Sequence, residues 1–162
     1  MRLFRIVLGY AVERGGLNVS LSRSVYFGKL TEEIRNKQAA VNFIEASFYY
    51  HSRPGVRLGE LFEIGKRLYS EAGYPEEWQN HTQGGIAGYK PREFLVTPDS
   101  EVVLRSNNLM SWNPTLSGVK AEDFGLVLEN GIRQLSVDKR WPFEEVDIKG
   151  IRFLKPKILE ME

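Results

Sequence analysis

The chain has 162 residues, and its 22 lysines and arginines nearly balance its 21 aspartates and glutamates, leaving a net charge of +1. The basic residues are scattered along the chain and form no block, which argues against a nucleic-acid-binding surface. Cysteine is absent, so disulfides and thiolate metal sites are excluded, in keeping with a reducing compartment. The length suits a single domain over residues 1–162.

The N-terminal sequence predicts neither a signal peptide nor a membrane span. Its apolar run is short and is followed by Glu13 and Arg14, whereas a span needs about 20 apolar residues. We therefore expect a cytoplasmic protein that binds neither nucleic acid nor membrane.

A β-hairpin is predicted at the start of the chain. Residues 2–10 and 17–27 are rich in residues that favour strands. Residues 11–16, AVERGG, lie between them and supply glycines for the turn.

Two helices are predicted next. From Thr31, a candidate N-cap, apolar residues recur with helical period until residues 53–55, RPG, end the pattern. A second helix is expected over residues 58–72, with Gly73 as the left-handed residue after it. The apolar positions predicted to be buried are Ile34, Val41, Ile44 and Phe48 in the first helix and Leu58, Leu61, Ile64 and Leu68 in the second.

Short segments punctuated by turn residues predict antiparallel strands in the second half. They cover residues 94–97, 102–104, 109–112, 124–128 and 132–135. Because strands, helices and strands follow one another without regular alternation, the sequence favours an α+β domain over a doubly wound sheet.

Four stretches of the sequence together resemble one protein family. They are SLSRSVYFGKL at residues 20–30, RPGVRLGELFEIGKRLYSEAGY at 53–74, HTQGGIAGYKPRE at 81–93 and SWNPTLSGVKAEDFGLVLENGIRQL at 111–135. In this order they resemble the creatinase, prolidase and aminopeptidase family over residues 3–136. The resemblance implies the pita-bread fold, an antiparallel curved sheet with helices on one face, in a form shortened at the N-terminus.

The resemblance also implies where a metal centre would lie. Metal-dependent members of the family hold two divalent ions with two aspartates, one histidine and two glutamates. The resemblance carries these five positions to Gly9, Ser20, His81, Asn113 and Glu122. Only His81 and Glu122 keep a ligand type, so we expect no metal pair and no cofactor.

The creatinase branch of the family is metal-free and uses its histidine to move protons. By that resemblance His81 would be the catalytic acid and base, and Glu122 its carboxylate partner. The residues expected to hold a small amide, amidine or dipeptide-like substrate are Arg92, Asn113, Tyr89 and Glu93. This hypothesis describes a hydrolase that works without metal.

A noncatalytic role is the alternative hypothesis. A histidine at a strand end beside glycines, such as His81, is commonly a hydrogen-bonded structural residue, and Arg92-Glu93 could be a solvated pair of low energy. The chain would then be a noncatalytic pita-bread descendant that binds a peptide, a small molecule or another protein.

A homo-oligomer, such as a dimer, is expected in either case. The strand at residues 3–8 would otherwise expose an apolar face or an unpaired edge.

Overall fold

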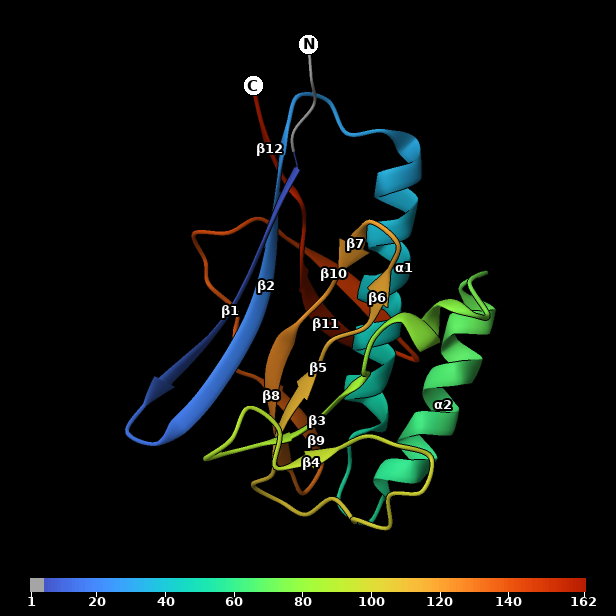
Figure 1. Ribbon diagram of the computed structural model, residues 1–162, viewed down its shortest axis with the longest axis vertical. Helices are drawn as coiled ribbons and strands as arrows, with labels where there is room; N and C mark the ends of the chain where they lie inside the picture. Colours follow the sequence, from blue (N-terminus) through green and yellow to red (C-terminus); the bar gives the residue numbers. More distant parts are fainter. Residues whose placement is uncertain (1–4) are drawn as a thin grey trace.

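The computed structural model describes residues 5–162 and begins with a long antiparallel hairpin that projects from the rest of the molecule (Figure 1). Strands β1 (Arg5–Arg14) and β2 (Leu17–Phe27) pair along their whole length. Gly15 and Gly16 alone form the turn, with φ of 60° and 82°. The prediction of a turn over residues 11–16 was wrong, because residues 11–14 pair with residues 17–20 and extend the first strand. The predicted residues 2–4 lie outside the described part.

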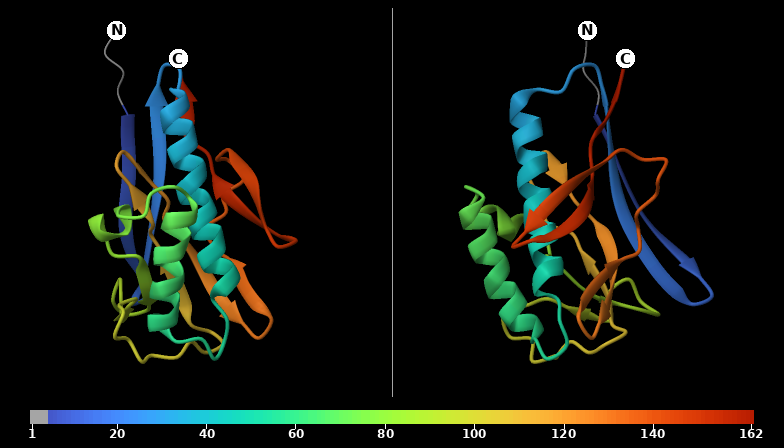
Figure 2. Two further views of the ribbon diagram at one scale, coloured as in Figure 1. Left: turned by 90° about the vertical axis from the view of Figure 1, so that its right-hand side faces the viewer. Right: turned by 180° about the vertical axis from the view of Figure 1, so that it is seen from behind.

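Both predicted helices are confirmed, and they pack side by side against one face of the sheets (Figure 2). Helix α1 (Glu32–His51) begins at Thr31, whose side-chain oxygen accepts a hydrogen bond from the Ile34 N–H at 3.3 Å. Helix α2 (Leu58–Glu71) ends one residue before the predicted boundary, and Gly73 follows with the expected positive φ of 88°. Of the apolar positions predicted to be buried, only Ile34 and Ile64 remain partly exposed.

The main sheet has five antiparallel strands in the order β4-β3-β5-β8-β9. Their bounds are β3 (Gly84–Ala87), β4 (Phe94–Leu95), β5 (Leu109–Trp112), β8 (Asp123–Leu128) and β9 (Gly131–Gln134). The predicted strand at residues 102–104 was wrong, because only Val103 makes an isolated bridge, to Arg57. The segment instead pairs its backbone with the start of α2.

Several shorter elements complete the chain. A 3-10 turn η1 (Glu77–Asn80) follows α2, and β6 (Thr115–Leu116) and β7 (Val119–Lys120) form a small hairpin after β5. Residues beyond 136, for which no element was predicted, form β10 (Phe143–Ile148), β11 (Ile151–Pro156) and β12 (Leu159–Met161). Strand β12 pairs in parallel with β2, which ties the end of the chain to the hairpin.

The main core lies between the helices and the five-stranded sheet. Trp112 of β5 stacks on Phe48 of α1 with ring centroids 4.1 Å apart, and both side chains are fully buried. The indole N–H of Trp112 donates to the Ser52 hydroxyl at 3.0 Å, which satisfies its only polar group inside the core. This contact fixes β5 on α1 and so positions the loop after β5.

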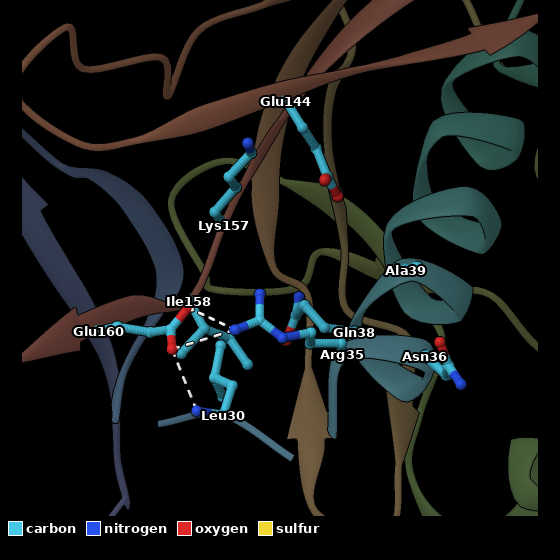
Figure 3. A pocket seen from close by; sticks show the side chains of 9 residues that line it. All are labelled: Leu30, Arg35, Asn36, Gln38, Ala39, Glu144, Lys157, Ile158 and Glu160. Atoms are coloured by element: carbon cyan, nitrogen blue, oxygen red, sulfur yellow. Dashed lines mark hydrogen bonds and ion pairs between the residues drawn. The ribbon is translucent and has the colours of Figure 1, made fainter. Parts of the chain in front are cut away.

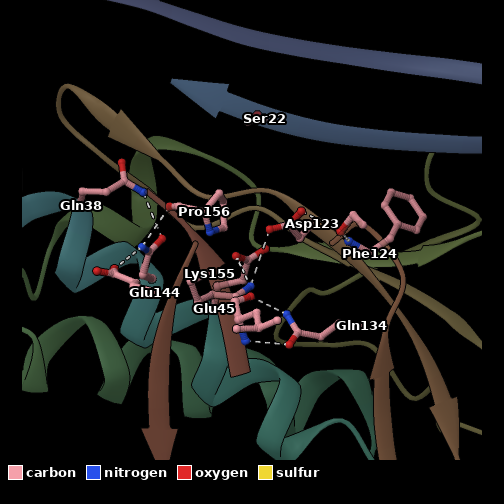
Figure 4. A network of polar contacts seen from close by, with 12 residues as sticks. Ser22, Gln38, Glu45, Asp123, Phe124, Gln134, Glu144, Lys155 and Pro156 are labelled. Carbon is pink, nitrogen blue, oxygen red and sulfur yellow. Dashed lines mark hydrogen bonds and ion pairs between the residues drawn. The ribbon is translucent and has the colours of Figure 1, made fainter. Parts of the chain in front are cut away.

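A buried charge network crosses the same interface (Figure 4). The Lys155 ammonium lies 2.6 Å from a Glu45 oxygen and 3.8 Å from an Asp123 oxygen, and Asp123 also pairs with Arg23 at 2.9 Å. Lys155 and Glu45 are completely buried. Burial raises the pKa of Glu45 to about 7, although the Lys155 charge opposes that rise. The network joins α1 to β2, β8 and β11.

The hairpin leaves apolar side chains uncovered. Ile6, Val7, Leu8 and Val12 of β1 are 39–55% exposed, and β1 is an edge strand. A partner chain could cover this surface, and the expected homo-oligomer stays a prediction. Among residues 5–162, no helix is long and apolar enough to cross a membrane.

Candidate functional site

One open pocket brings together all five positions at which the resemblance places metal ligands. Its volume is about 380 Å³, and we call it the site pocket. It is lined by Gly9, Ala11, Ser20, His81, Thr82, Pro91, Arg92, Asn113, Lys120 and Glu122. These residues are far apart in the sequence, so the fold creates the pocket.

Each wall of the site pocket comes from a different element. The hairpin supplies one wall from β1 and β2, the segment before β3 supplies His81, and the loop before β4 supplies Arg92. Asn113 follows β5, and Lys120 and Glu122 flank the junction of β7 and β8. The backbone bond from the Ser22 N–H to the Glu122 carbonyl, 3.0 Å long, holds the hairpin against this junction.

Two glycines of β3 allow the strands around the site to approach closely. A Cβ on Gly84 would overlap the Ser111 carbonyl of β5, and one on Gly85 would overlap the Phe94 carbonyl of β4. Gly84 also has a φ of 136°, which other residues adopt at a cost. These glycines therefore allow β3 to lie close to β4 and β5, and this close packing sets the distances between the segments that line the site pocket.

Glu122 is the most constrained side chain of the site. One carboxylate oxygen accepts from the Ser20 hydroxyl at 3.0 Å and from Arg92 at 3.2 Å. The other accepts from the Ser22 hydroxyl at 2.8 Å and pairs with Lys120 at 2.9 Å. Burial acts most strongly and raises the pKa of Glu122, but Lys120, Ser22 and Ser20 together outweigh it, so the pKa lies below its ordinary value. The group is a carboxylate at neutral pH.

Arg92 is held from several sides. Besides its contact with Glu122, its Nη1 donates to the Ser20 hydroxyl at 3.2 Å and to the Pro91 carbonyl at 2.6 Å. Burial lowers the pKa of Arg92, and the Glu122 charge opposes that shift. Arg92 thus acts first as a fixed counter-charge for Glu122.

His81 lies exposed at the rim of the site pocket. Its Nδ1–H donates to the carbonyl oxygen of Thr82 at 2.8 Å, so Nε2 is the acceptor in the neutral ring. Within residues 5–162 no hydrogen bond joins His81 to Glu122, whose oxygens already have partners. The proposed acid–base pair lines one pocket, but no hydrogen bond joins the two described side chains.

Asn113 is almost fully buried, with 4% of its surface exposed, yet its Oδ1 has no hydrogen-bond partner. A buried acceptor of this kind is costly unless a ligand or water supplies a donor. Within the part of the chain that the structure describes, Asn113 is therefore the one predicted substrate-holding residue that lines the site pocket and carries an unpaired buried acceptor.

Tyr89 and Glu93 do not line the site pocket. Tyr89 is 83% exposed, and its ring packs on Gly16 of the hairpin turn. A Glu93 oxygen accepts from the Lys90 N–H at 3.1 Å, which closes the loop that carries Arg92. Tyr89 and Glu93 therefore stabilise segments next to the site pocket and do not contribute to its lining.

Lys120 and Ser22, the two closest partners of Glu122, were not among the predicted site residues. A signal for Lys120 was available, because alternate residues of an extended strand point to the same side and Lys120 lies two positions before Glu122. Ser22 repeats the same spacing after Ser20. Across residues 5–162, no three histidine, aspartate or glutamate side chains gather in a way that could hold a metal ion.

A second pocket of about 320 Å³ lies between the start of α1 and the C-terminal strands (Figure 3). Glu160 crosses it, accepting from Arg35 at 2.9 Å and from the Leu30 N–H at 3.0 Å. These bonds tie β12 to α1, and none of the predicted site residues lies in this pocket.

Comparisons with known proteins give a consistent result. No protein-family profile matches the chain. The Xaa-Pro dipeptidase of Pyrococcus horikoshii is 26% identical over 129 residues, which are 76% of this chain and 36% of that protein. The solved structure of the X-Pro aminopeptidase from Thermotoga maritima superposes with a TM-score of 0.77 at 18% identity, over 97% of this chain and 42% of that one.

In sequence, the chain is similar to the Xaa-Pro dipeptidases. It has their pita-bread fold, as the resemblance implied, with antiparallel sheets and helices on one side. It spans about a third of the length of the curated relatives that it matches.

The same fold also occurs in a protein with a different name. The N-terminal domain of the FACT complex subunit SPT16 from Eremothecium gossypii superposes with a TM-score of 0.68 at 10% identity, over 80% of this chain and 33% of that one. The fold alone therefore does not decide between peptidase and binding protein.

Proposed function

We propose that the site pocket binds a small amide or dipeptide-like ligand without a metal pair. The proposal rests on the contacts of the Glu122 carboxylate. Both oxygens of its carboxylate are occupied by an ammonium or guanidinium group and by a serine hydroxyl, at 2.8–3.2 Å. A divalent cation would have to displace these cations and approach Lys120 and Arg92 against their charge.

The other groups of the site pocket do not fit a pair of metal ions either. Gly9 offers no side-chain donor, and Ser20 offers a neutral hydroxyl that already bonds to Glu122. Asn113 offers only a neutral amide oxygen. Hard divalent ions in proteins are commonly held by several carboxylates, and this pocket has one.

The pocket nevertheless keeps what small-ligand sites require. It is a concave surface with a few fixed polar groups, and its charged residues are held by hydrogen bonds before any ligand arrives. Xaa-Pro dipeptides are the natural first ligands to examine, since the relatives are named for them.

Hydrolysis is the second candidate function, and the position of His81 favours it. His81 lines the same pocket, and its Nε2 is free to accept a proton in the neutral ring. Against hydrolysis, the Glu122 carboxylate pairs with Arg92 and Lys120, and within residues 5–162 it makes no hydrogen bond to His81. We therefore place binding first.

Alanylproline separates the two candidates. The chain is expected to bind alanylproline in calorimetry and to release no free proline from it. His81→Ala should leave proline release unchanged at background, as should His51→Ala, whose site lies at the end of α1. Proline release that is lost in His81→Ala and kept in His51→Ala would establish the hydrolase instead. Failure of alanylproline to bind at millimolar concentration would contradict the proposed function.

A further inference from the structure

The side chains of the site pocket carry more positive than negative charge, which the resemblance does not imply. In metal-dependent members, four carboxylates face two divalent cations, so the charges cancel. In this chain one buried carboxylate, Glu122, faces two fixed monovalent cations, Arg92 at 3.2 Å and Lys120 at 2.9 Å. The pocket therefore carries an excess of positive charge, held by protein side chains.

We propose that this excess charge binds a carboxylate of the ligand, and that Lys120 makes the contact. This inference rests on the proposed function and names the ligand class. It concerns molecules that carry a carboxylate together with an N–H group, such as a dipeptide or an N-acylated amino acid.

Lys120 is the more accessible of the two cations, with 22% of its side chain exposed against 14% for Arg92. An ammonium has three N–H donors, and the contact with Glu122 accounts for one of them. The side chain is 22% exposed and lines the pocket, so a ligand can reach it. Arg92 is less accessible, because its Nη atoms already bond to Ser20, Pro91 and Glu122, and its Nε, which has no partner, is buried.

Glu122 fixes the ammonium in place before a ligand arrives. The carboxylate is itself held by the hydroxyls of Ser20 and Ser22. A lysine fixed in this way loses less freedom on binding than a free one, which strengthens its contact with the ligand.

Asn113 supplies the second half of the recognition. Asn113 lines the same pocket, and its Oδ1 is a buried acceptor without a partner. An N–H group of the ligand would satisfy it. Together, a cationic donor at Lys120 and a neutral acceptor at Asn113 select a ligand with an anionic oxygen and an N–H, and disfavour ligands that are only cationic.

Alanylproline and alanylprolinamide test the inference, because they differ only in the carboxylate. The unmodified chain is expected to bind the acid at least about tenfold more tightly than the amide. A difference of this size is what one charge-assisted hydrogen bond contributes to affinity. In Lys120→Gln the acid should bind no better than the amide, whereas affinity for the amide should stay within about threefold. Lys120→Arg should recover part of the preference.

Lys66→Gln is the matched control, because Lys66 is an exposed lysine on α2 that pairs with Glu63. It should keep the full preference for the acid. Equal binding of acid and amide by the unmodified chain would overturn the inference and leave the proposed function intact. This comparison uses only the unmodified chain, so it does not depend on the folding of any variant. A preference that survives in a folded Lys120→Gln would overturn the role of Lys120. If neither compound binds, the proposed function fails and the inference fails with it.

Discussion

Lys155→Met is expected to lower the free energy of unfolding by about 3–5 kcal/mol, the cost of leaving an uncompensated charge in the interior. Lys155 is completely buried and lies 2.6 Å from Glu45. Its removal leaves Glu45 and Asp123 without the ammonium between them, so the folded state must either hold an unpaired buried carboxylate or take up a proton on Glu45, whose pKa burial already raises to about 7. Urea or guanidinium unfolding, with one slope for both proteins, measures the change.

Two further variants make this expectation specific. Lys66→Met removes an exposed ion pair and should cost less than about 1 kcal/mol. Adding Glu45→Leu to Lys155→Met removes the stranded carboxylate and should recover part of the loss, because an apolar pair can replace a buried ion pair at little cost. A loss below about 1 kcal/mol for Lys155→Met itself would show that the Lys155–Glu45 pair is not buried as described.

Gly85→Ala is expected to cost about 3 kcal/mol, at the upper end of what overpacking costs. The new methyl group would overlap the Phe94 carbonyl, and a backbone group cannot turn aside as a side chain does. The strands β3 and β4 would have to separate, and the loop that carries Arg92 would move with β4. The variant should therefore also weaken alanylproline binding.

Gly9→Ala is the matched control for this effect. Gly9 also lies in a strand and lines the site pocket, but a Cβ there would meet only the Ser22 hydroxyl at an ordinary 3.5 Å. Its cost should stay below about 1 kcal/mol. Equal stability of the two variants would mean that β3 and β4 do not approach as closely as described.

The elements set by local patterns were predictable from the sequence. Thr31 and the apolar period after it gave α1 its start and its buried face, and Gly73 marked the end of α2. The hairpin was placed correctly, but its first strand was predicted too short, since residues 11–14, which include the charged Glu13 and Arg14, also pair with β2. They belong to an exposed edge strand, where charged residues are tolerated.

Features that depend on distant residues could not be predicted in the same way. Lys155 and Glu45 are 110 positions apart, and nothing in either local sequence distinguishes a buried charge from an exposed one. Likewise, the resemblance pointed to Ser20 and Glu122, but their hydrogen bond depends on how the hairpin lies against β8. The C-terminal strands lay beyond the resemblance and were not predicted at all.

Metal dependence of ligand binding tests whether Arg92 and Lys120 occupy Glu122 in place of metal ions. Alanylproline should be titrated into the chain after treatment with EDTA and again with added manganese, cobalt or zinc, with metal content measured in each sample. The dissociation constant should be the same in every case, and no sample should contain stoichiometric metal. Two equivalents of bound metal, with alanylproline bound or hydrolysed only in their presence, would contradict it.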